Sequence, residues 1–90
     1  MPTISKFDGY KIYMFYNDHQ PPHIHVEYNG KKSTIEILNP KNIKGDIKTK
    51  DLKVIQRWIK LRKDELMNNW NLAMYNKSLT IVQPYNKKEK

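Results

Sequence analysis

Residues 23–38 read HIHVEYNGKKSTIEIL, and this stretch decides the fold. Two runs that alternate between apolar and polar side chains flank the pair Asn29-Gly30. Asn-Gly between alternating runs is the signature of a β-hairpin with a two-residue type I′ turn. A turn of that length fixes the register of the two strands, so Tyr28 is predicted to pair with Lys31.

This register divides the side chains of the hairpin between the two faces of a sheet, because successive residues of a strand point to opposite sides. The face expected to be buried carries the aliphatic residues Ile24, Val26, Ile35 and Ile37. The opposite face is expected to carry the polar residues His23, His25, Glu27, Thr34 and Glu36. His23 is then predicted to lie opposite Glu36, and His25 opposite Thr34.

The three histidines of the chain all fall within NDHQPPHIH, residues 17–25. The prolines and the Asn-Asp pair are turn residues, so a stiff turn carrying Asp18 and His19 is predicted before the strand. His23 and His25 are two residues apart on that strand and point the same way, with Cα atoms about 6.6–6.8 Å apart. The sequence therefore predicts two neighbouring imidazoles below a turn that carries a third.

Three interpretations of this cluster remain open. In the first, His23 and His25 transfer protons while RNA is cleaved through its own 2′-hydroxyl, and His19 and Asp18 position or polarise them; the usual histidine pKa of about 6.5 suits this chemistry and no cofactor is needed. In the second, His23 and His25 hold a divalent metal such as zinc, which requires a third ligand. The candidates for that third ligand are Asp18, His19, Glu27 and Glu36. In the third, Asp18 caps the turn and the histidines are polar residues of a sheet face.

Shorter extended segments are predicted on both sides of the hairpin. Residues 10–16, YKIYMFY, are apolar at both parities, which is typical of a strand that is covered on both faces. Residues 39–48 hold turn residues around two isoleucines and are expected to include a short edge strand. Residues 79–85, LTIVQPY, are expected to return to the sheet or to pack across a helix.

Residues 50–76 show apolar positions at spacings of three, four and seven, which predicts one long helix. Thr49 is the expected N-cap, and Asn68-Asn69 is the expected point of a break. The predicted fold is therefore α+β: a small, mainly antiparallel sheet of three to four strands packed on one long C-terminal helix.

Two surfaces of this helix are candidates for binding. The basic residues opposite the main apolar stripe form either a solvated face or a track for substrate phosphates: Lys53, Arg57 and Lys60. A second group widens the apolar arc beyond what a surface helix needs, so it is either wrapped by the sheet or used as a partner interface: Val54, Trp58 and Leu61.

Composition and charge limit the class of protein. Ninety residues with a net charge of +8 predict one basic domain at 1–85 followed by a basic tail at 86–90, and such a field attracts polyanions such as RNA. The chain has no cysteine, no apolar leader and no apolar run of about 20 residues, so a soluble cytoplasmic protein that does not enter membranes is expected. So small a core suits completion by a partner or a second copy as a homodimer.

The motif N-D-H-x-P-P-H-x-H closely resembles a family of small bacterial proteins of unknown function, number four-one-six-zero in the DUF series. The resemblance covers nearly the whole chain: MPTISKF at 1–7, NDHQPPHIH at 17–25, EYNG at 27–30, RWIKLRKDELMNNW at 57–70 and LTIVQP at 79–84. The chain departs little from the family, with Asn68-Asn69-Trp70 where Glu-Asn-Trp or a similar triplet is expected.

The resemblance implies a gene pair, because genes of this family commonly lie beside another small open reading frame in an arrangement similar to a toxin and its antitoxin. The motif residues are then the expected working site: Asp18, His19, Pro21, Pro22, His23 and His25. The leading expectation is a toxin-like ribonuclease or phosphoester hydrolase that is neutralised by the partner from the adjacent gene. The alternatives are a non-enzymatic module that binds protein or nucleic acid, and a metal-dependent hydrolase.

Overall fold

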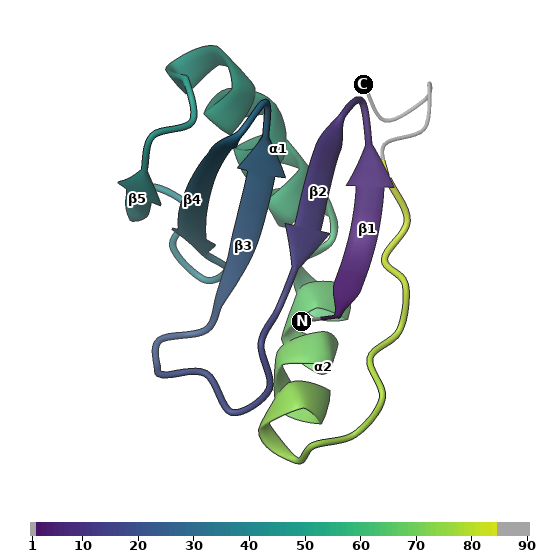
Figure 1. The fold of residues 1–90 in the computed structure, drawn as a ribbon. Coiled ribbons are helices and arrows are strands. Elements are labelled where there is room, and N and C mark those ends of the chain that lie inside the picture. Colours follow the sequence, from purple (N-terminus) through teal and green to yellow (C-terminus); the bar gives the residue numbers. More distant parts are fainter. Residues whose placement is uncertain (1, 85–90) are drawn as a thin grey trace.

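One antiparallel sheet dominates the structure, a computed structural model that describes residues 2–84. The strands in this part of the chain are β1 Thr3–Phe7, β2 Tyr10–Tyr13, β3 His23–Tyr28, β4 Lys31–Glu36 and β5 Ile43–Gly45. They lie side by side in sequence order, as Figure 1 shows. The predicted basic tail and Tyr85 lie outside the described residues.

The expectation of three to four strands was wrong, because five are present in the described part of the chain. The strand that sequence reasoning missed is β1, which pairs with β2 across the turn Asp8-Gly9. Both turn residues have positive φ, 50° and 86°, which the Asp-Gly pair adopts readily in short hairpin turns. The short edge strand expected within 39–48 is confirmed as β5.

The central hairpin has the register that the Asn29-Gly30 turn predicts. Both turn residues have positive φ, 50° and 76°. Tyr28 pairs with Lys31 and His23 pairs with Glu36, so the two faces are divided as expected. The aliphatic face is buried at every expected position: Ile24, Val26, Ile35 and Ile37.

Two helices follow the sheet where one long helix was expected. α1 spans Thr49–Leu61 and α2 spans Lys63–Met74. The helix breaks at Arg62, whose φ of −110° and ψ of 19° leave the helical range, and not at Asn68-Asn69. The side chain of Arg62 donates hydrogen bonds to the carbonyls of Gln83 and Pro84, so the break joins the helices to the C-terminal segment.

Two local expectations for the helical region were also wrong. Thr49 is the first residue of α1 and not its N-cap; Lys48 takes the cap position without a side-chain cap bond. Asn69 is fully buried within α2 because its side chain pairs with Thr80, donating to the carbonyl and accepting from the backbone N–H, both at 2.8 Å. Its amide holds the C-terminal segment and does not interrupt the helix.

The core lies between α1 and the aliphatic face of the sheet, with α1 behind the strands in the view of Figure 1. Trp58 of α1 is fully buried; its ring lies 5.3 Å from that of Phe7, and its Nε1–H donates to the carbonyl of Gln83 at 2.9 Å. The wide apolar arc of the helix therefore reflects core packing at Trp58, which offers no side-chain surface to a partner. Val54 is half-buried and Leu61 is exposed, and their use as an interface stays a prediction.

The segment after α2 returns to the sheet alongside β1, which is one of the two positions expected for residues 79–85. The backbone N–H of Val82 donates to the carbonyl of Ile4 at 2.8 Å, and Val82 is fully buried. Within the described residues, no helix has the length and apolar character needed to cross a bilayer.

Glycine at position 45 is predicted to be essential for holding β5 on the sheet. Its φ is +125°, and an added Cβ would overlap the carbonyl oxygen of Lys32 and crowd Ser33. Gly30 also has positive φ, +76°, but an added Cβ there meets nothing. We expect Gly30→Ala to lower the free energy of unfolding by about 1–2 kcal/mol and Gly45→Ala by roughly 2–5 kcal/mol, since strain and overlap add. Urea unfolding measures both, and equal losses would contradict the close packing of β5.

Candidate metal centre

The connection between β2 and β3 folds back toward the sheet and brings Asp18 to the histidines. Asn17 has a φ of 52°. Its backbone N–H donates to the carbonyl of Ala73 at 3.3 Å, and its side-chain amide donates to Asn76 at 3.1 Å. These bonds tie the connection to the end of α2, so the next residue is held over the start of β3.

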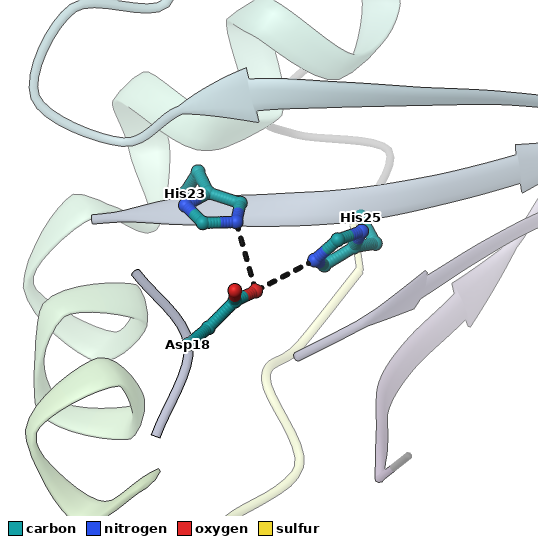
Figure 2. A group of neighbouring side chains, drawn as sticks. All are labelled: Asp18, His23 and His25. Atoms are coloured by element: carbon teal, nitrogen blue, oxygen red, sulfur yellow. Dashed lines mark hydrogen bonds and ion pairs between the residues drawn. The ribbon is translucent and has the colours of Figure 1, made fainter. Parts of the chain in front are cut away.

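The carboxylate of Asp18 meets both strand histidines at a single oxygen. Oδ2 of Asp18 lies 2.9 Å from Nε2 of His23 and 2.9 Å from Nε2 of His25 (Figure 2). One ligand atom from each of the three residues lies within 4.8 Å of the others. The turn therefore does fold over the sheet face, and it supplies the carboxylate that the sequence left among several candidates.

His23 faces a hydrogen-bond acceptor at each ring nitrogen. Its side chain is buried, and Nδ1 lies 2.8 Å from the carbonyl oxygen of Pro21, which can only accept. Nε2 faces the Asp18 carboxylate, which also accepts when ionised. A neutral imidazole has one N–H, so it satisfies only one of these contacts. Both ring nitrogens of His23 are therefore held by oxygen acceptors, one from the backbone and one from Asp18.

His25 and Asp18 are each oriented by further contacts. The ring of His25 stacks on Tyr13 with centroids 5.2 Å apart and meets the edge of Phe15 at 4.5 Å. The second oxygen of Asp18, Oδ1, accepts the backbone N–H of His19 at 2.9 Å. Metal ligands in proteins are commonly fixed by such outer contacts, and the bond from His23 Nδ1–H to a carbonyl is the usual form for histidine.

The pKa of Asp18 lies below its ordinary value. Burial alone would raise it, but the hydrogen bond with His25, the backbone N–H of His19 and the nearby His23 and His25 together outweigh burial. The carboxylate is therefore ionised at neutral pH, which is the form that binds a cation.

Two of the three separations are close to those found around a small divalent cation. Two ligand atoms about 2.1 Å from one ion are about 3.0 Å apart at a right angle and about 3.4 Å apart in a tetrahedron. Each Asp18-to-histidine separation is 2.9 Å, and the two imidazole nitrogens lie within 4.8 Å of each other. Binding therefore needs an outward shift of the carboxylate and a placement of both imidazole nitrogens about 3.0–3.4 Å apart. Two histidines and one carboxylate form a ligand set used by catalytic zinc and by non-haem iron, and both leave positions open for water or substrate.

A pocket of about 460 Å³ adjoins the cluster on the face of the sheet opposite α1. Its floor is formed by His23, His25, Thr34 and Glu36, and its walls by His19, Pro21, Asn42, Ile43 and Lys44. That volume is within the range of small-ligand sites, which is about 300–1,000 Å³. The two histidines of the cluster therefore border a space large enough for a substrate.

The remaining predicted residues take different positions. His19 lies outside the three-ligand group; its side chain is 80% exposed and its ring stacks on that of His23 at 4.9 Å. Glu36 lines the pocket beside the group and accepts a hydrogen bond from Asn42 at 2.9 Å. Glu27 lies two residues after His25 on β3, where the strand register places it opposite Lys11 of β2 and Lys32 of β4.

The basic residues predicted to bind substrate lie on the far side of the sheet from this pocket. Lys53, Arg57 and Lys60 are exposed on α1, and α1 covers the aliphatic face. Sequence reasoning missed the pocket residues of the 42–44 segment, because only the pairing of β5 with β4 brings them beside the histidines. The one available signal in the sequence was the short edge strand expected within residues 39–48, which became β5.

Replacing Asp18 is predicted to change how stability depends on pH. Because its folded-state pKa is lowered, the carboxylate stabilises the fold above its unfolded pKa of about 3.9, and this contribution is lost as pH falls through the folded-state pKa. With a metal chelator present, we expect Asp18→Asn to be less stable than the unsubstituted protein by about 1–3 kcal/mol at neutral pH. Below about pH 4, the variant should lose less of its stability than the unsubstituted protein does. Urea unfolding from pH 3 to 7 tests this, and parallel curves for the two proteins would contradict it.

Comparison with known proteins identifies the family and nothing more specific. No curated protein and no solved structure matches the chain. A family model does match, over residues 9–71, which include the three cluster residues, the hairpin and α1. The chain therefore belongs to the family described as "Domain of unknown function (DUF4160)".

Proposed function

We propose that this protein is a metal-dependent phosphoester hydrolase whose centre is formed by Asp18, His23 and His25, with zinc or a similar divalent ion as cofactor. The observation that carries the proposal is the convergence of one carboxylate oxygen and two imidazole nitrogens at 2.9 Å beside an open pocket. Supporting it, His23 already donates its other ring N–H to a carbonyl, as a metal-bound histidine does.

The pocket also contains a residue suited to proton transfer. A divalent ion at this centre would lower the pKa of a water molecule to about 7. Glu36 lines the pocket without belonging to the ligand group, and Asn42 holds one of its oxygens. Water would add across the phosphoester: its oxygen bonds to phosphorus, the bond to the leaving oxygen breaks, and Glu36 carries the proton from water to that oxygen.

A phosphate-bearing polyanion such as RNA is the substrate class that the charge favours. The chain carries a net charge of +8, and a field of this sign concentrates polyanions around the protein. This support comes from the whole molecule and is independent of the metal ligands.

A metal-free ribonuclease is the second candidate, and the position of His23 favours it. Contacts to both Pro21 and Asp18 would hold the imidazole of His23 in a fixed orientation, which proton transfer by a general acid or base requires. We rank it second because the Nε2 atoms of both His23 and His25 are engaged by the same Asp18 oxygen, each at 2.9 Å, as ligands of one ion would be. Cleavage that persists in chelator would reverse this order.

The cellular role we propose is that of the toxin-like component of a bacterial gene pair, neutralised by a protein from the adjacent gene. The family resemblance suggests the pair, and the net charge of +8 suits an acidic antitoxin-like partner.

Metal content should depend on the three cluster residues and not on the third histidine. For protein purified without a His tag, we expect about one zinc ion per chain, measured by mass spectrometry of the metal after dialysis. His25→Ala should lose the ion. His19→Ala is the matched control and should keep it, since His19 is exposed and outside the group. Equal zinc in both variants would contradict the centre.

Induced expression should slow bacterial growth if the proposed role is correct. Co-expression of the adjacent gene should restore growth, and the double variant His23→Ala and His25→Ala should be harmless at equal soluble abundance. Plating after induction measures each case. Growth inhibition that persists in the double variant would contradict a role for the cluster in toxicity.

A further inference from the structure

We propose that single-stranded nucleic acid lies across the outer face of the sheet, from the Asp18 centre to Lys44, which binds a phosphate next to the one being cleaved. This inference rests on the proposed function for the role of the centre and goes beyond it in naming the path and form of the substrate. The path follows a row of directly paired residues: His25, Thr34 and Lys44. Tyr13 begins the same row but is buried, so it supports the ring of His25 and does not contact the bound strand.

The strand pairing sets the direction of the row. Tyr13 pairs with His25, His25 with Thr34, and Thr34 with Lys44, so the row crosses β2 to β5. Directly paired residues point to the same face, and neighbouring strands are about 4.7–4.9 Å apart. Lys44 is thus two strands, or about 10 Å, from His25 at the backbone. The long side chain of Lys44 can bridge the part of this distance that a bound phosphate does not itself occupy.

The pocket supplies surfaces for a base between these two points. His25, Thr34 and Lys44 all line it, and His19, Pro21 and Ile43 form much of its wall. The His19 ring is highly exposed yet is held on both sides, because Nδ1 lies 3.2 Å from the carbonyl of Gln20 and the ring stacks on His23. A fixed, exposed imidazole offers a stacking surface, and unpaired bases stack on such rings regardless of sequence.

The charges on this face favour an anion at the end of the row. Lys11 and Lys32 flank Glu27 as its paired neighbours, which offsets that carboxylate. Among the residues that line the pocket, Glu36 is the acidic one, and it is hydrogen-bonded to Asn42. Lys44 is exposed, lines the pocket and pairs with Thr34, so its ammonium is available to a phosphate.

Two features distinguish this path from the basic face of α1. Lys53, Arg57 and Lys60 lie across the sheet from the centre, so a strand bound to them would not reach it. Stacking on His19 requires an unpaired base, which a duplex does not offer. The geometry therefore points to a single strand on the sheet and not to a duplex on the helix.

The test measures binding without cleavage. Fluorescence anisotropy of a labelled ten-nucleotide single-stranded RNA is recorded in chelator over a range of salt concentrations, with DNA of the same sequence in parallel. We expect Lys44→Ala to weaken binding about tenfold and to lower the slope of log affinity against log salt by about 0.7, the value for one lost contact to a single strand. His19→Ala should weaken binding at least about fivefold.

Lys53→Ala is the matched control, because it removes the same charge from the opposite side of the molecule. It should change affinity less than about twofold and leave the salt slope unchanged. Equal or larger loss in Lys53→Ala than in Lys44→Ala would overturn the proposal, as would equal affinity for duplex RNA or for a mononucleotide. Lys44-dependent binding without any cleavage after zinc is added would support the path while removing the proposed hydrolase activity.

Discussion

The Asn29-Gly30 turn fixes how β3 lies on β4, and the rest of the structure depends on that register. With both turn residues at positive φ, the strands can pair in only one way. A shift by one residue would turn the aliphatic row to solvent and direct His23 and His25 at α1. The same register aligns His25 with Thr34 and, through β5, with Lys44. The register of this hairpin thus determines both which side chains form the core and which form the candidate site.

Asp18 adds the second requirement, which is the closure of the connection over the sheet. Its carboxylate contacts two residues of β3, while the neighbouring Asn17 is bonded to the end of α2. The break at Arg62 separates α2 from α1, and α2 extends past the end of the sheet in Figure 1. The ring centroid of Trp70 in α2 lies 5.2 Å from that of His23. A buried imidazole and a partly buried carboxylate are costly to desolvate unless they are paired. The lowered pKa of Asp18 reflects that pairing, so the cluster has physical reasons to stay assembled.

Local sequence signals predicted the hairpin, its register and the shared face of His23 and His25, because turn chemistry and period-two alternation act over a few residues. They did not predict that Asp18, and not Glu36 or His19, completes the group, because that depends on the bonds from Asn17 to Ala73 and Asn76, far away in the sequence. Trp58 illustrates the same limit: its position in the helical arc left core and interface equally open, and its contact with Phe7 decided for the core. The break at Arg62 likewise follows from bonds to residues 83 and 84.

We propose that Asp18, His23 and His25 bind one divalent ion through a carboxylate oxygen and two imidazole nitrogens. X-ray absorption at the zinc edge of the zinc-loaded, untagged protein tests this most directly, because it reports the identity and distance of the ligand atoms. We predict two imidazoles and at least one oxygen at about 2.0–2.2 Å, and the loss of this spectrum together with the ion in His25→Ala. A shell of oxygen atoms alone, or a spectrum unchanged in that variant, would contradict it.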